Sequence, residues 1–171
     1  VRRSPKHGCG IFVLEDTEQG CLLTPYPQHI VAKIVGDDYH FVRYPAIRSR
    51  ELEDEMLRKY TVDLDFRSLE FDWEDLDVAI AGDPSIHSDG VGHLVNDAID
   101  GEKFINEGRE EMYNTLSERL NNVDMLLFHT DKGRFSLWFI AQRDLEAGEE
   151  LYYSYGVNYW RKQATTPLPV V

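Results

Sequence analysis

The chain has 171 residues, of which 42% are hydrophobic and 12% aromatic, and this composition is sufficient for one folded domain with a buried core. Its 18 lysines and arginines stand against 31 aspartates and glutamates, so a formal charge of −13 disfavours nucleic-acid binding and favours a basic protein or peptide partner. The same acidity also maintains solubility, so charge alone does not identify a function. No apolar run is long enough to span a membrane, and Cys9 and Cys21 are too few for a disulfide framework. We therefore expect a soluble protein, without a membrane association, in reducing surroundings.

Short apolar runs separated by turn residues make up the first quarter of the chain. The runs GIFVLED, CLLTPY and HIVAKIV predict strands within residues 8–35. Asp38–Tyr44 predicts a further strand. These elements indicate a domain that begins with a succession of short strands.

The segment 48–77 is expected to form an inserted helix followed by an acidic stretch. Ser49 is a candidate N-cap, and apolar residues recur every four positions behind it, at Leu52, Met56 and Tyr60. Acidic residues then alternate with aromatic residues up to residue 77, which predicts an edge hairpin or a loop. Val78–Ile80 predicts the next strand.

A second helical pattern follows a loop rich in Pro, Ser, Asp and Gly. The run EGREEMYNTLSERL predicts a helix whose apolar residues lie on one face, namely Met112, Leu116 and Leu120. It belongs to a predicted helical insertion spanning 98–120.

The last third of the chain is expected to return to strands. Met125–Phe128 and Phe135–Ala141 predict two strands around the turn HTDKGR, and RDLEAGEEL predicts a turn. A C-terminal tail spans 161–171, and its last part, ATTPLPVV, is expected to be extended or mobile. Many short strands with helical insertions predict a β-rich α+β fold, organised as a single domain over 1–171.

Three separated segments together resemble one known family. KHGCGIFVLEDTEQG, SDGVGHLVNDA and IAQRDLEAGEELYYSYGVNYW follow, in this order, the pattern of the SET domain, the family of lysine methyltransferases that use S-adenosylmethionine. The resemblance runs from Lys6 to Trp160. It implies the SET fold, a β-clip of several small curved sheets, with a C-terminal pseudoknot in which the chain end threads through a loop of the preceding segment.

The resemblance also implies which residues contact the cofactor. In the family the first glycine-containing loop surrounds the methionine end of S-adenosylmethionine, and glycine permits close approach of the backbone. An asparagine amide, here Asn96, offers both a donor and an acceptor for an amino acid's charged groups. Trp160 is expected to cover the adenine or the mouth of the lysine channel. The full expected set is Lys6, His7, Gly8, Cys9, Gly10, His93, Leu94, Asn96, Asp97, Tyr155 and Trp160.

The sequence departs from the family pattern beside Asn96. Asp97 stands where the family usually has histidine, and the expected Cys-x-Pro-Asn does not follow it. The segment 98–120 reads instead as an insertion, after which Asn122 is a candidate for the later asparagine. These departures bear on cofactor placement more than on the fold.

Three tyrosines are the expected catalytic residues. Tyr155 takes the place of the family's catalytic tyrosine. Tyr153 occupies a position where the family has tyrosine or phenylalanine, a choice associated with the number of methyl groups added, and tyrosine favours mono- or dimethylation. Tyr26 falls near a family tyrosine that lines the lysine channel, although Gln28 and His29 replace the residues that usually follow it.

The resulting hypothesis is methyl transfer to a lysine of a basic protein, with histone tails as the default substrate. It implies a chromatin regulator in the nucleus, with the cytoplasm as the open alternative. The rival hypothesis is a catalytically inactive SET-like module that binds peptides or proteins. A hydrolase using Ser154 lacks the first glycine of G-x-S-x-G, and the six histidines form no HxH or HxxxH pair, so we expect no metal.

Overall fold

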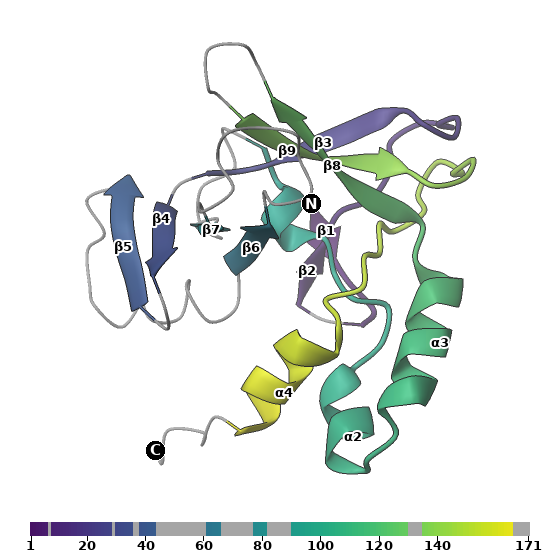
Figure 1. Ribbon diagram of the computed structural model, residues 1–171. Helices are drawn as coiled ribbons and strands as arrows, with labels where there is room; N and C mark the ends of the chain where they lie inside the picture. Colours follow the sequence, from purple (N-terminus) through teal and green to yellow (C-terminus); the bar gives the residue numbers. More distant parts are fainter. Residues whose placement is uncertain are drawn as a thin grey trace. The chain divides into compact units, whose positions relative to one another are not determined.

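The computed structural model describes residues 1–6, 8–28, 30–35, 38–43, 61–65, 77–81, 90–129 and 135–165 (Figure 1). Within these ranges the chain forms small antiparallel sheets and a few helices, which confirms the predicted α+β class. Two compact units divide it: one combines 1–24 with 94–171, and the other comprises 25–93. No helix in the described ranges has the length and apolarity that a bilayer crossing requires. The predicted pseudoknot stays a prediction.

Strands of the first unit carry a small core on alternating residues. β1 (Arg2–Arg3) pairs antiparallel with β2 (Cys9–Gly10). β8 (Val123–His129) and β9 (Phe135–Ala141) form the predicted antiparallel pair, and β3 (Leu22–Tyr26) lies beside β9. Every second side chain of β9 is buried, as expected of a strand with one face on the core: Leu137, Phe139 and Ala141.

The predicted strand in GIFVLED is not a regular strand. Residues 11–15 contribute only an isolated bridge, between Phe12 and Glu150. Their backbone instead bonds the closing segment: Val13 donates its N–H to Glu149 O (2.9 Å), and Ile11 O accepts from Leu151 N (2.8 Å). The apolar run is thus extended and paired with residues near the other end of the chain, a partner that local periodicity cannot reveal.

The second unit is built on a four-stranded sheet. β4 (Ile30–Val35), β5 (Asp38–Arg43), β6 (Thr61–Asp65) and β7 (Asp77–Ala81) follow the order β5-β4-β7-β6 with antiparallel pairing. This confirms the strands predicted from HIVAKIV, Asp38–Tyr44 and Val78–Ile80, and it places the start of the acidic stretch in an edge strand. The predicted helix behind Ser49, and the rest of segment 48–77 apart from β6 and Asp77, lie outside the described residues.

Two helices occupy the predicted insertion. Asp100 caps α2 (Gly101–Asn106) by accepting the Glu102 N–H at 3.2 Å, and Gly108, with φ of +68°, separates α2 from α3 (Glu110–Leu120). The predicted apolar face of α3 is only partly buried, because Leu116 alone of its three residues packs against the core cluster. Met112 and Leu120 are 47% and 48% exposed, while the fully buried positions are Tyr113 and Ser117.

A further helix covers the start of the tail. α4 (Val157–Thr165) includes Ala164 and Thr165, which corrects the prediction of an extended or mobile chain for these two residues, and 166–171 lie outside the described residues. The indole of Trp160 anchors this helix in a cluster with Ala98, Ile99 and Tyr113. Gly101 makes the contact possible, because a Cβ at that position would collide with the indole. α4 therefore packs along α2, and α2 beside α3 (Figure 1).

Candidate active site

Segments from three parts of the chain meet in the first unit. The start of the chain bonds the closing segment through Ile11 and Val13, as described above. The closing segment in turn lies parallel to the segment after η2 (Gly92–Leu94): Asn96 bridges Tyr152, and Asn96 O accepts the Tyr153 N–H at 2.9 Å. The predicted cofactor loop, Asn96 and the tyrosine segment are thus neighbours.

A buried carboxylate joins these three segments. Glu150 is 5% exposed, and its Oε2 accepts from the Ser4 hydroxyl at 3.0 Å and from the Tyr152 hydroxyl at 2.7 Å. Its Oε1 accepts from Asn96 Nδ2 at 3.0 Å. We call Ser4, Gly10, Asn96, Glu150 and Tyr152 the Glu150 cluster. Burial, followed by the contact with Glu150, raises the pKa of the Tyr152 phenol, which therefore stays protonated and donates.

The two glycines of the first loop, Gly8 and Gly10, suit their positions for different structural reasons. At Gly10 a Cβ would collide with Glu150 Oε1 and lie 3.0 Å from Asn96 Nδ2, so only glycine fits against the cluster. At Gly8 the backbone has φ of +42° and the space where a side chain would stand is open. Between them the Cys9 carbonyl accepts from Asn96 Nδ2 at 3.1 Å. The loop is packed at one end and open at the other.

Asp97 is the centre of a second buried cluster. It is 0% exposed, and its Oδ2 accepts from the Tyr113 hydroxyl at 2.5 Å, from Trp160 Nε1 at 3.0 Å and from the Tyr155 N–H at 3.1 Å. Its Oδ1 accepts the Ile99 N–H at 3.0 Å. We call Asp97, Tyr113, Ser154 and Trp160 the Asp97 cluster. Four donors of the protein bond this one carboxylate, so the hydrogen-bonding capacity of Asp97 is satisfied within the protein.

The side chain of Tyr155 lies beside both clusters. Its hydroxyl donates to the Val95 carbonyl at 2.8 Å, next to Asn96 in the chain. Its ring stacks on Trp160 with centroids 5.9 Å apart, and meets Tyr159 edge-on at 4.7 Å. A phenol is therefore held in a fixed direction by its backbone, its ring and its hydroxyl.

Comparison with known families identifies the family to which the chain belongs. The model of the SET domain matches residues 8–156, which is most of the chain. The protein belongs to the SET-domain family. A comparison with curated proteins gives no significant match.

Membership of the SET-domain family implies a protein lysine methyltransferase that uses S-adenosylmethionine. The residues present fit the methionine end of that cofactor. The loop at Gly8 is exposed and has open space beside its backbone, and the buried amide of Asn96 lies against the same loop. Backbone groups of an exposed loop suit a ligand group that carries both an ammonium and a carboxylate, and the Asn96 amide holds this loop in place through the Cys9 carbonyl.

The second expected catalytic tyrosine lies on the same segment. Tyr153 is half-buried, and its ring meets Phe139 edge-on with centroids 5.5 Å apart. Burial, and secondarily the charge of Asp124, raises the pKa of its phenol. The hydroxyl of Tyr153 therefore stays neutral at physiological pH.

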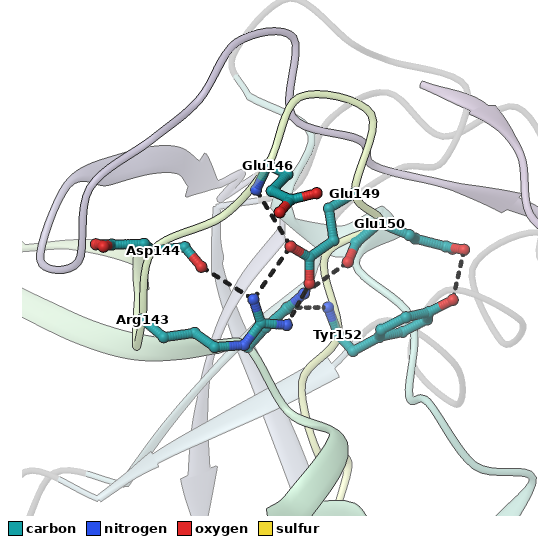
Figure 2. Close-up of polar contacts among 7 residues, drawn as sticks. Arg143, Asp144, Glu146, Glu149, Glu150 and Tyr152 are labelled. Atoms are coloured by element: carbon teal, nitrogen blue, oxygen red, sulfur yellow. Dashed lines mark hydrogen bonds and ion pairs between the residues drawn. The ribbon is translucent and has the colours of Figure 1, made fainter.

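The adjacent glutamates of the closing motif have separate roles. Figure 2 shows Glu149 directed toward Arg143, and Glu150 directed toward the Tyr152 hydroxyl. Arg143 Nη1 donates to Glu149 Oε2 at 3.1 Å, and this contact holds the pKa of Glu149 below its usual value. Glu150 was not among the site residues expected from the sequence. The alternating direction of an extended chain, with buried Leu151 next to it, was the available signal.

Other residues of the predicted set are distributed over both units. Lys6 is exposed and its N–H donates to the Ser4 hydroxyl at 3.0 Å, Leu94 ends η2, and His7 lies outside the described residues. Tyr26 and His93 belong to the second unit. Both are buried there, with ring centroids 6.4 Å apart in an edge-on arrangement.

Within the described ranges, no group of three or more His, Cys, Asp or Glu residues has the arrangement of a metal site. The residues that sequence reasoning missed are Ser4, Glu150 and Tyr113. Each has at least one partner far along the chain: Ser4 and Glu150 are 146 positions apart, and Tyr113 and Trp160 are 47 positions apart.

Proposed function

We propose that the protein transfers a methyl group from S-adenosylmethionine to a lysine side chain of a basic protein, with histone tails as the default substrate. The observation that carries this proposal is the placement of the Tyr155 phenol. It is bonded to Val95 O, and Val95 precedes Asn96, whose amide contacts the Gly8–Gly10 loop. These contacts link the expected cofactor loop to the expected catalytic hydroxyl, which supports the proposal. A formal charge of −13 favours encounter with a cationic substrate.

The hydrogen bond of Tyr155 determines what its hydroxyl offers a substrate. The phenol gives its single proton to Val95 O, so its oxygen acts as an acceptor toward a second group. The amine of an incoming lysine is a donor and matches that oxygen. Tyr155 thus orients the amine without becoming a fixed charge, and the neighbouring Tyr153 adds an aromatic wall for the aliphatic stem.

The substrate lysine must lose its proton before its lone pair can attack. A free lysine has a pKa of about 10.4 and is almost wholly charged at neutral pH. When bound, S-adenosylmethionine supplies the methyl group and a cationic sulfonium. Burial among tyrosine rings disfavours the ammonium form, as a nearby positive charge also does, and both effects lower the pKa of the lysine.

Tyr155→Phe tests the proposed function. We expect at least a roughly tenfold loss of turnover, equivalent to about 1.4 kcal/mol, because the oriented hydroxyl is removed while the ring remains. Radiolabelled S-adenosylmethionine and a panel of histones and non-histone proteins provide the measurement, and near-ultraviolet circular dichroism reports the fold. Tyr159→Phe is the matched control, because it also removes one phenol hydroxyl, from a ring of α4 that packs against Tyr155. Wild-type turnover in Tyr155→Phe would remove Tyr155 from the mechanism.

The degree of methylation is proposed to depend on Tyr153. Its hydroxyl remains protonated and can hold a water beside the amine, which limits space for a methylated product. We therefore expect mono- or dimethylation. In Tyr153→Phe the product should shift toward higher methylation, as read by mass spectrometry of the substrate. An unchanged product distribution would contradict this role.

The alternative function is a SET-like module that binds peptides without methyl transfer. The specific observation in its favour is Asp97 at the family's histidine position, together with the missing Cys-x-Pro-Asn. Titration with S-adenosylmethionine or its demethylated product discriminates the two, because an active enzyme binds both and a peptide-binding module need bind neither. A purely structural acidic domain would bind neither cofactor nor basic peptide. Nuclear localisation follows only if histones are the substrate.

A further inference from the structure

The insertion helix α3 contributes a tyrosine to the interior of the site. Tyr113 is fully buried, and its hydroxyl donates to Asp97 Oδ2 at 2.5 Å. The same oxygen accepts the Gly156 N–H and the Trp160 Nε1–H, each at 3.1 Å. It also lies 3.1 Å from the Ser154 hydroxyl. One phenol therefore contacts residues on both sides of Tyr155 in the chain.

Tyr113 and Asp97 divide the backbone around Tyr155 between them. Asp97 Oδ2 accepts the N–H of Tyr155 at 3.1 Å, and the Tyr113 oxygen accepts the N–H of the next residue, Gly156. Peptide groups are planar, so fixing two successive ones fixes the Cα between them and the direction in which its side chain leaves. The turn at Gly156 has φ of +81°, a backbone conformation that glycine adopts readily and that is strained for a residue with a side chain.

The protonation state of Tyr113 agrees with this arrangement. Burial, and after it the hydrogen bond to the Asp97 carboxylate, raises the pKa of its phenol to about 12. The phenol thus keeps its proton at neutral pH. It donates that proton to Asp97 and still offers lone pairs to the two N–H groups.

We propose that Tyr113 is a positioning residue for methyl transfer: together with Asp97 it fixes the backbone of Tyr155 and Gly156, and so aims the Tyr155 phenol at the substrate amine. This rests on the proposed function, in which Tyr155 contacts that amine. The aspartate at the family's histidine position and the tyrosine on the predicted insertion act as one unit. The aspartate that departs from the family pattern thus has a specific hydrogen-bond partner in Tyr113.

Tyr113→Phe keeps the buried ring and removes only the hydroxyl. We expect faster amide hydrogen exchange at Tyr155 and Gly156, with the amides of α3 exchanging at wild-type rates. With core histones and labelled S-adenosylmethionine, kcat should fall about threefold to tenfold while KM for the histone stays unchanged, since a misaimed group affects the transition state rather than binding. Leu116→Ala is the matched control. It loosens the same helix but leaves the hydroxyl in place, so kcat should be retained.

A double variant separates positioning from a merely structural role. If Tyr113 acts through Tyr155, then Tyr113→Phe should have no further effect on kcat once Tyr155→Phe is present. Losses that multiply in the double variant would overturn the proposal, as would unchanged exchange at Gly156 in the single variant. Should Tyr113→Phe not fold, Asp97→Asn replaces it with the same expectations, because it keeps the side-chain shape and removes an acceptor of the Tyr155 N–H.

These measurements also distinguish this proposal from the proposed function. Absence of methyl transfer by the wild-type protein to every substrate tested would end the proposed function. Exchange at Tyr155 and Gly156 would then decide by itself whether Tyr113 holds this segment. Normal methyl transfer with unchanged exchange in Tyr113→Phe would end the positioning role and leave the function intact.

Discussion

Asn96 and Asp97 are consecutive residues that serve different parts of the molecule. Asn96 contacts the N-terminal loop through Cys9 O and the closing segment through Glu150. Asp97 contacts the insertion helix through Tyr113 and the C-terminal helix through Trp160. One extended step of the chain thus sends a polar side chain into each of the two buried clusters.

The two clusters differ in origin. The Glu150 cluster is assembled around residues that match the family pattern, Gly10, Asn96 and Glu150. The Asp97 cluster is assembled around the residue that departs from it and a tyrosine of the insertion. The difference teaches that the cluster beside the expected cofactor loop is built from residues of the family pattern, whereas the backbone of Tyr155 is bonded to residues outside that pattern. Variants in each cluster should therefore have separable effects.

Asp97→Ala should produce the largest effect on stability. It removes the acceptor of the Tyr113 hydroxyl and of two backbone N–H groups inside the core, and it leaves the Trp160 indole with the Tyr113 oxygen alone. We expect a loss of about 3–5 kcal/mol in the free energy of unfolding, as for other broken buried charged networks. Urea denaturation provides the measurement.

Asp16→Ala is the control for that variant. Asp16 is exposed and accepts a single backbone N–H, that of Ala147, at 2.9 Å. Its loss should be about 1 kcal/mol or less. Comparable losses in the two variants would contradict the central place given to Asp97.

Gly10→Ala should act on the other cluster and on cofactor binding. The added methyl group would displace the Glu150 carboxylate, so we expect about 1–3 kcal/mol of destabilisation from overpacking. Calorimetry should show S-adenosylmethionine bound at least about tenfold more weakly. Gly20→Ala is the control: φ is +85° at that turn and no atom lies near the added methyl, so it strains the backbone without touching the cluster. Equal cofactor affinity in both variants would separate Gly10 from the binding site.

An alkaline stability profile gives the smallest expected effect and isolates the Asp97 cluster. The phenol of Tyr113 has a folded pKa of about 12 against an ordinary value of 10.0, so unfolding releases its proton between these values. Its contribution is fully present below pH 10 and is lost as the pH rises through 12. At pH 11 the wild-type protein should have lost about 1 kcal/mol more than Tyr113→Phe, relative to pH 9. Parallel profiles would show that Tyr113 titrates normally.

Local patterns predicted the strands well, because strand periodicity and turn residues are properties of neighbouring positions. The pairs β4 with β5 and β8 with β9 lie at the predicted runs. The run after Gly10 failed because its partner is the closing segment, far away in sequence. The prediction of the buried face of α3 was incomplete for a related reason. The most deeply buried residue of that helix is Tyr113, whose hydroxyl bonds Asp97 in the core, and the apolar pattern did not include it.

The candidate site was predictable as far as the family pattern extends. Gly10 lies against Asn96, and Tyr155 bonds the carbonyl of the preceding residue, Val95. That these residues bind cofactor and lysine stays a prediction. The partners that hold them were not predictable. The Asp97 carboxylate bonds Tyr155 and Trp160, which are 58 and 63 positions away in the chain, and such distant contacts give no local signal. The relation of Tyr26 to this region stays a prediction.

The packing of Trp160 against Gly101 sets how much chain the fold requires. The family match ends at residue 156, yet the indole four residues later fills the interior beside α2 and donates to Asp97. A chain cut at the boundary of the match would open a hole the size of an indole next to Asp97. The smallest self-sufficient folding unit of this protein therefore extends beyond the conventional edge of its domain, into α4.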